Sequence, residues 1–100
     1  MTFRIIYDLV KRIPVGKVTT YKQIALKLRL KDIRIIGYAL HKNPDPKTIP
    51  CHRVILSDGS LASGYAFGGA SMQKELLLKE GVQFKKGKVD LELYLWPKQN

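Results

Sequence analysis

Residues 49–55 read Ile49-Pro50-Cys51-His52-Arg53-Val54-Ile55. This run holds the only cysteine of the 100-residue chain, one of its two histidines, and a proline that fixes the backbone just before them. A lone cysteine in a protein interior is more often an inert, small apolar side chain than a nucleophile. Whether Cys51 is reactive therefore depends on the other residues that the chain brings to it.

Length and composition are those of one ordinary globular domain spanning residues 1–100, because 45% of the residues are hydrophobic and 26% are charged. No apolar run approaches the roughly 20 residues that a membrane-spanning helix needs. The first residues carry an early acid and resemble no secretory signal. We therefore expect an intracellular protein without a membrane partner, in the cytoplasm or, in a eukaryote, in the nucleus.

The chain is strongly basic, with a formal net charge of +10 and an isoelectric point near 9.9. Such a charge indicates an anionic partner, with nucleic acid favoured over an anionic membrane surface. The alternative is a lysine-rich, solvated surface of the kind found in thermophiles. A zinc site is not expected, because His41, Cys51 and His52 are too few ligands and lack the usual spacing.

Three helical segments are predicted before residue 42. Apolar residues recur at helical spacing within 3–12, 21–28 and 33–41. Thr20 begins a capping-box pattern with Gln23, and Asp32 is placed to cap the third segment. The second and third segments, joined by a tight turn over 29–32, indicate a helix-turn-helix.

The third segment carries Arg34, His41 and Lys42, side chains suited to DNA. Gly37 in its middle costs about 1 kcal/mol relative to alanine, so it needs a reason. Close approach of another backbone, either the preceding helix or DNA, would be sufficient. The alternative is a pair of amphipathic helices without a partner.

The second half of the chain predicts less regular structure. Two prolines make residues 43–46 a stiff loop, and residues 64–69 form a glycine-bearing loop with two aromatic residues. Residues 54–56 predict a buried strand, and the turn signal at 57–60 predicts a hairpin that returns at Leu61. The tail after residue 88 predicts a terminal strand or an extended segment docked on the core. The fold class is therefore mainly α with a short β-hairpin.

The last long helix is predicted over 71–81, with Met72, Leu76 and Leu77 facing inward and Gly81 ending it. Glu80 lies at its C-terminal end, where the helix dipole disfavours an acid. Either a nearby cation holds Glu80 there, or the side chain is simply solvated.

Pro50-Cys51-His52-Arg53-Val54 forms part of a larger pattern. Asn43-Pro44 precedes it, and a Gly-Tyr loop and a helix ending in Glu80-Gly81 follow. Together these features resemble the C-terminal, active-site domain of the O6-alkylguanine-DNA alkyltransferases, from about residue 3 to residue 84. The resemblance implies a single winged-helix-like domain that contains a helix-turn-helix and acts as a monomer without a cofactor. It also implies base flipping in duplex DNA and irreversible transfer of the alkyl group from O6-alkylguanine to a cysteine.

The resemblance implies roles for individual residues. Cys51 resembles the nucleophile, His52 the base that takes its proton through a water, and Glu80 the acid that orients His52. Because Cys51 and His52 are adjacent, they can cooperate only if the backbone between them is not a regular strand. The catalytic set is completed by Tyr21 and by Asn43, which resembles the asparagine holding the helix-turn-helix against the active-site loop.

Two further sets follow from the same resemblance. Arg34 resembles the arginine that enters the base stack from the minor groove. The residues expected at DNA are Arg34, Tyr21, Gly37, Lys42 and Arg53. The residues expected around the guanine are Leu40, Pro50, Ile55, Tyr65, Ala66 and Phe67.

Two other functions compete with alkyl transfer. Alkyltransferase-like proteins share this fold and recruit other repair factors, but they replace the cysteine, which is present here as Cys51. A basic helix-turn-helix regulator with an inert cysteine would leave Tyr21, Asn43 and Glu80 as coincidences.

Overall fold

The computed structural model describes residues 3–61 and 64–98. The elements run α1 (Arg4–Lys11), β1 (Thr19–Thr20), α2 (Tyr21–Leu28), α3 (Arg34–His41), a 3-10 helix η1 (Cys51–Arg53), β2 (Val54–Ile55), α4 (Gly69–Lys79), β3 (Phe84–Lys85), β4 (Lys88–Val89) and α5 (Leu91–Tyr94). The predicted fold class is confirmed: the described part of the chain is mostly helical, with two short two-stranded sheets.

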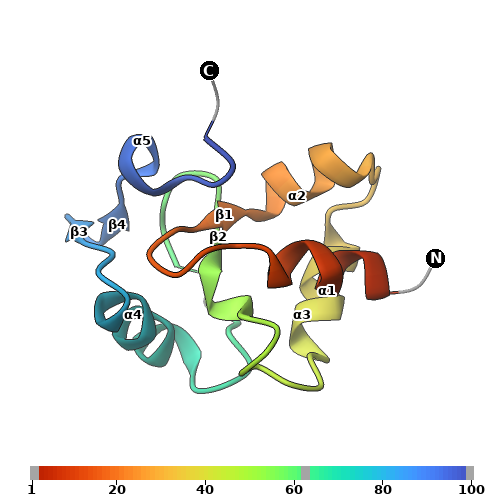
Figure 1. The fold of residues 1–100 in the computed structure, drawn as a ribbon, viewed down its shortest axis with the longest axis horizontal. Helices are drawn as coiled ribbons and strands as arrows, with labels where there is room; N and C mark the ends of the chain where they lie inside the picture. The colour runs from red at the N-terminus through yellow and green to blue at the C-terminus, as the bar shows by residue number, and fades with distance from the viewer. Residues whose placement is uncertain (1–2, 62–63, 99–100) are drawn as a thin grey trace.

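Two groups of elements flank a central ribbon made of β1 and β2 (Figure 1). On one side lie α1, α2 and α3, and on the other lie α4, the β3–β4 hairpin and α5. The two residues of β2 belong to different cores, since Val54 joins the helical cluster and Ile55 joins the second. Alternate residues of a strand face opposite ways, so this short strand serves both sides.

The helix-turn-helix forms as predicted. Thr20 accepts a hydrogen bond from the Gln23 amide at 3.0 Å and so caps α2. The helix ends at Arg29, which adopts a left-handed conformation (φ 56°). Ile33 occupies the N-cap position of α3 in place of the predicted Asp32, whose Oδ1 accepts a hydrogen bond from the Arg34 amide at 3.0 Å.

The hairpin lies elsewhere than predicted. The turn at 57–60 does form, with the Leu56 amide donating to Ser60 at 3.0 Å, but β2 pairs in parallel with β1 instead of with a strand near Leu61. The hairpin of the fold joins β3 to β4, where residues 86 and 87 both have positive φ, as a tight hairpin turn requires. The amide of Val89 donates to Gly59 at 2.8 Å, so β4 lies across the earlier turn.

The tail also differs from the prediction of a terminal strand. Residues 91–94 form the short helix α5, because Asp90 caps it by accepting a hydrogen bond from the Glu92 amide at 3.0 Å. Docking on the core is confirmed, since the Trp96 amide donates to the Val18 carbonyl at 2.7 Å.

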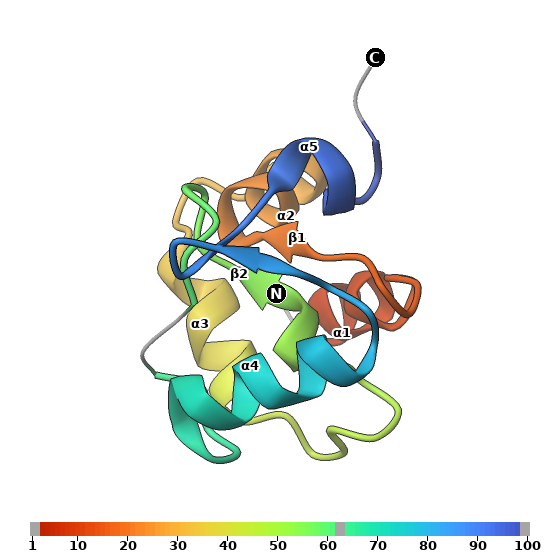
Figure 2. The ribbon, with the colours of Figure 1, turned by 90° about the vertical axis from the view of Figure 1, so that its left-hand side faces the viewer.

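Helix α4 is the element that closes over the Cys51 turn. Figure 2 shows it passing in front of the segment that leads from η1 into β2. Its buried face differs from the prediction, because Gln73 and Leu77 are buried while Met72 is 38% exposed. Gly81 follows with a φ of 92° and ends the helix as expected.

Candidate active site and DNA-facing surface

Cys51 and His52 lie in a tight helical turn, not in a strand. The Arg53 amide donates to the Pro50 carbonyl at 3.0 Å, and this bond closes the turn. Cys51 is 3% exposed and His52 is 8% exposed. Cooperation between Cys51 and His52 requires that the backbone between them is not a regular strand. The turn meets this requirement, because the backbone there is helical.

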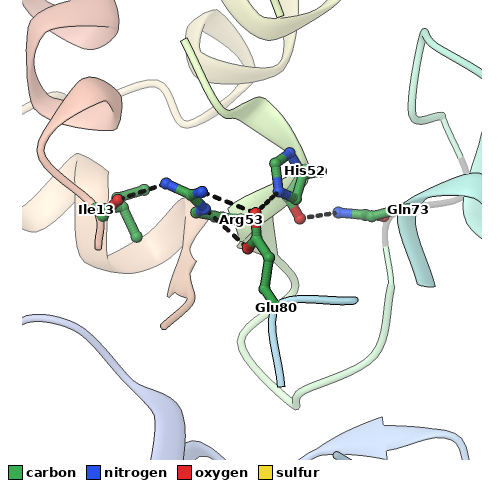
Figure 3. A network of polar contacts seen from close by, with 5 residues as sticks. All are labelled: Ile13, His52, Arg53, Gln73 and Glu80. Carbon is green, nitrogen blue, oxygen red and sulfur yellow. Dashed lines mark hydrogen bonds and ion pairs between the residues drawn. The ribbon is translucent and has the colours of Figure 1, made fainter. Parts of the chain in front are cut away.

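Glu80 joins this turn from the end of α4 (Figure 3). Its Oε2 lies 2.8 Å from Nε2 of His52. Arg53 donates to both carboxylate oxygens, with Nε to Oε1 at 2.9 Å and Nη2 to Oε2 at 2.7 Å, and its Nη1 donates to the Ile13 carbonyl at 2.8 Å. Arg53 is therefore the cation that holds an acid at the unfavourable end of the helix.

The pKa of Glu80 reflects these neighbours. Burial alone would raise the pKa, but hydrogen bonds from Arg53 and His52 and their positive charges outweigh it and lower the pKa below its ordinary value. The carboxylate is therefore ionised at neutral pH and can orient the imidazole or stabilise its protonated form.

The pKa of the Cys51 thiol is shifted in the opposite direction from that of Glu80. Burial raises its pKa, and a hydrogen bond with the Asn43 side chain only partly offsets this. The same thiol affects Tyr7, Tyr21 and Tyr65. Burial raises the pKa of each tyrosine, and the negative charge of a Cys51 thiolate raises it further. For Tyr65 the two effects together bring the pKa to about 12. At neutral pH the resting group is a thiol, so nucleophilic chemistry here needs a base.

Asn43 ties the end of α3 to the loop before Cys51. Its Nδ2 donates to the Ile49 carbonyl at 2.8 Å, and its Oδ1 accepts from the Asp45 amide at 2.9 Å. The side chain is 6% exposed, so both bonds lie out of water. Helix α3 and the Cys51–Arg53 turn are thereby linked through one residue.

A surface hollow of about 440 Å³ lies beside α3. It brings together the predicted residues Tyr21, Arg34 and Gly37. A Cβ added at Gly37 would meet nothing within 4 Å, so no other element of the described chain requires a glycine there. Of the two reasons considered for this glycine, close approach of the preceding helix is wrong. Lys42 lies at the end of the same helix, where it lines a neighbouring hollow with Arg34.

A second hollow, of about 530 Å³, opens beside the turn and is lined by Pro50, His52, Tyr65, Phe67 and Glu80, among others. The rings of Tyr65 and Phe67 meet edge to face, with centroids 5.8 Å apart. The volume is within the range of small-molecule sites.

Four predicted residues are placed differently. Ile55 is fully buried in the second core and lines neither hollow, because it pairs with Thr20 in the central ribbon. Leu40 is buried in the same core as Cys51, and Ala66 is exposed on the loop. Arg53 has a side chain only 12% exposed, and its guanidinium is engaged by Glu80 and Ile13, so its arrangement does not support a DNA contact.

Sequence reasoning gave no role to Gln73, which the structure places against the turn. Its Nε2 donates to the carbonyls of His52 and Val54, both at 3.0 Å. The sequence does carry a signal for this placement. Gln73, Leu77 and Glu80 recur at helical spacing, which puts the three residues on one face of a helix.

Among residues 3–61 and 64–98, no helix is long and apolar enough to cross a membrane. Within the same residues, no group of three or more His, Cys, Asp or Glu side chains could hold a metal ion.

Known proteins with similar sequences are named as methyltransferases. A bifunctional methyltransferase/endonuclease of Picrophilus torridus is 41% identical over 90 residues, which is 89% of this chain and 30% of the relative. A methylated-DNA–protein-cysteine methyltransferase of Methanothermobacter thermautotrophicus is 44% identical over 82 residues, or 82% of this chain and 45% of the relative. The chain thus spans less than half the length of these two relatives.

Two solved structures are similar over most of the chain. Atl1 of S. pombe, in complex with damaged DNA containing O6-carboxymethylguanine, superposes with a TM-score of 0.79 at 36% identity, covering 94% of this chain and 93% of Atl1. The O6-methylguanine-DNA methyltransferase of Pyrococcus kodakaraensis gives 0.70 at 36% identity, covering 80% of this chain and 46% of that protein.

The family model for the DNA-binding domain of 6-O-methylguanine DNA methyltransferase matches residues 2–82. This match takes in the helix-turn-helix, the Cys51 turn and α4 with Glu80. The chain belongs to the 6-O-methylguanine DNA methyltransferase family, and it carries the DNA-binding domain of that family.

Proposed function

We propose that this protein repairs DNA by taking the alkyl group of O6-methylguanine irreversibly onto Cys51. The observation that carries the proposal is the contact of His52 Nε2 with Glu80 Oε2 at 2.8 Å. His52 directly follows Cys51, the only cysteine of the chain. An ionised acid that orients the imidazole of the residue next to a buried cysteine supports an activated cysteine nucleophile.

The proposed reaction moves one methyl group and one proton. The Cys51 thiol gives its proton to His52, and Glu80 stabilises the imidazolium that forms. The sulfur then forms a bond to the methyl carbon while the bond from that carbon to guanine O6 breaks, leaving its electron pair on the base. The guanine then accepts the proton from the His52 imidazolium. The products are S-methylcysteine and ordinary guanine, and no cofactor is consumed.

DNA would bind on the α3 surface. Arg34, Tyr21 and Gly37 share one hollow there, and Lys42 adds positive charge at the end of the helix. Because Cys51 is 3% exposed, a base must leave the duplex to reach its thiol, and we assign to Arg34 the filling of the space that the base leaves. Arg53, buried with Glu80, is reassigned from DNA contact to positioning that carboxylate.

We place the guanine in the second hollow, which His52 lines and Cys51 does not. Pro50, Tyr65 and Phe67 also line it, with Ala66 on the same loop, and Leu40 belongs to the same buried core as Cys51. Since Ile55 lies in the other core, we assign it no contact with the base.

The wider proposal is that residues 1–100 act as one monomeric domain, equivalent to the C-terminal, active-site part of the longer alkyltransferases. Its target is duplex DNA, which places its work in the nucleoid or, in a eukaryote, in the nucleus.

The second candidate is a lesion-binding protein that transfers no alkyl group. The similarity to S. pombe Atl1 over 93% of its length, against 46% for the Pyrococcus enzyme, favours it. Retention of Cys51 with its His52–Glu80 pair argues against it, because binding alone needs no oriented base.

Intact-mass spectrometry after incubation with an O6-methylguanine duplex separates the two. We expect the mass to rise by one methyl group per molecule, and Cys51→Ala to abolish the gain while it still binds the duplex. Binding of the lesion by the wild-type chain without any gain in mass would establish the second candidate.

A further inference from the structure

Gln73 is a fully buried polar residue on α4, with 1% of its surface exposed. Glutamine is mostly found at protein surfaces, and its burial requires compensation by hydrogen bonds. Only part of that compensation is present: Nε2 makes two bonds, whereas Oε1 finds no partner among the described residues. A buried polar atom left unpaired calls for an explanation.

The orientation of the amide is fixed by its surroundings. If the amide were reversed, Oε1 would face the carbonyl oxygens of His52 and Val54, which are both acceptors. The observed orientation therefore satisfies two backbone acceptors and leaves one side-chain acceptor unpaired. An apolar residue would avoid the unpaired atom, but it would give up both bonds to the backbone.

Those two carbonyls lie on either side of Arg53, at the point where the Cys51–Arg53 turn passes into β2. Carbonyls at the end of a short helical turn lack partners within the turn and leave it free to shift. By accepting from Gln73, both carbonyls tie the turn to α4. Figure 3 shows the bond to the His52 carbonyl.

Helix α4 thus holds His52 at two places. Gln73 binds its backbone carbonyl, and Glu80 contacts its imidazole from the same helix. Seven residues separate the two, which is about two turns or roughly 10 Å along a helix axis, and brings both to the same face. Fixing backbone and ring together removes the freedom that His52 would otherwise have relative to Cys51.

We propose that Gln73 is a positioning residue for alkyl transfer: it locks the Cys51–Arg53 turn so that the imidazole of His52 and the thiol of Cys51 keep their relative placement. The proposal rests on the function proposed above. It assigns to Gln73 no contact with DNA or with the alkylated base.

A single-use acceptor allows the rate of transfer and the fraction of folded protein to be measured separately. With an excess of O6-methylguanine duplex, the final fraction of methylated protein counts competent molecules, and the rate constant reports how well they are organised. For Gln73→Met, which keeps the size and removes both donors, we expect a saturating rate about ten- to a hundredfold lower. The final fraction and the half-saturating duplex concentration should be unchanged.

Leu77→Met is the matched control, because Leu77 is fully buried on the same face of α4 one turn further on. It should leave the rate within about twofold of the wild type. A saturating rate for Gln73→Met within the same twofold would overturn the proposal.

Gln73→Glu covers the case in which the methionine variant does not fold. A protonated glutamic acid donates one hydrogen bond, whereas the carboxylate would face two carbonyl oxygens. Burial against two carbonyl oxygens should raise the pKa of this glutamate above the ordinary value of about 4.3, so we expect its rate relative to the wild type to fall as the pH rises from about 5 to about 8. A constant ratio would contradict the proposed role.

Reaction of Cys51 with iodoacetamide separates failure of this proposal from failure of the proposed function. If the wild-type chain gains no methyl group, alkyl transfer is refuted, but Gln73→Met should still change the rate and pH dependence of thiol alkylation, while Leu77→Met should not. If alkylation is the same in all three, Gln73 does not organise the turn.

Discussion

The guanidinium of Arg34 is held by the carboxylate of Asp32, two residues earlier. Nε donates to Oδ1 at 3.0 Å and Nη2 donates to Oδ2 at 2.9 Å, while the Arg34 amide donates to Oδ1 as well. Both side chains are largely exposed, and the hydrogen bonds with Arg34 lower the pKa of Asp32 below its ordinary value. In the proposed complex Arg34 must exchange this carboxylate for DNA.

Asp32→Asn is therefore expected to strengthen DNA binding. It removes a negative charge that competes with DNA phosphate for Arg34, and the asparagine oxygen can still accept the bond from the Arg34 amide. Because exposed pairs contribute little, we expect a gain in affinity of about two- to fivefold, measured by fluorescence anisotropy with an undamaged duplex. Asp58→Asn, which makes the same change in net charge beside Lys88, is the control and should give a smaller gain. Equal gains would show that only net charge matters.

Gly37→Ala should change stability and DNA affinity in opposite directions. Alanine favours a helix by about 0.5–1 kcal/mol over glycine, and the added Cβ meets nothing within 4 Å, so the midpoint of thermal unfolding should rise. The same methyl group would hold α3 away from a closely approaching DNA backbone. Affinity for the duplex should therefore fall by severalfold; an unchanged affinity would mean that Gly37 is not kept for DNA.

Tyr38 is an exposed aromatic residue of α3, 60% accessible, one turn from Arg34. It lines a hollow with Arg34 and Lys42, so a bound duplex would cover it. We expect Tyr38→Ala to weaken binding about tenfold through lost apolar contact. The slope of affinity against salt concentration should not change, because no phosphate contact is lost. Leu26, 64% exposed on α2, is the control, and Leu26→Ala should have little effect.

Local patterns predicted the helix-turn-helix well because its signals act over a few residues. The cap of α2 by Thr20, the bond of Asp32 to the Arg34 amide and the helical end at Gly81 all depend on neighbours in the sequence. The hairpin was misplaced for the complementary reason. Residues 57–60 are typical of a hairpin turn, but β2 pairs with β1, which lies more than 30 residues earlier in the chain. Nothing in the sequence near the turn indicates that pairing.

The site was predicted unevenly for the same kind of reason. The contact between His52 and Glu80 was expected from the family resemblance, yet the place of Arg53 depends on how α1 and α4 meet around it. A basic residue in a basic protein is readily assigned to DNA, and only the tertiary structure shows that this one is paired. Gln73 was overlooked because amphipathic patterns count polar residues as exposed, and they assigned Met72 to the interior.

Glu80→Gln should destabilise the protein at neutral pH and have progressively less effect in acid. The substitution leaves the guanidinium of Arg53, 12% exposed, without its ionic partner, and breaking a buried ion pair on one side costs about 3 kcal/mol or more. The pKa of Glu80 is lowered in the folded state, so its contribution is present above the ordinary value of 4.5 and is lost as the pH falls through the folded value. Urea unfolding of wild type and variant at several pH values should show the difference in unfolding free energy shrinking below about pH 4.5.

Glu75→Gln, which breaks only an exposed pair with Lys79, is the control and should change stability by less than about 0.5 kcal/mol at any of these pH values. A difference between wild type and Glu80→Gln that stays constant down to the acid limit would show that the charge of Glu80 does not stabilise the fold.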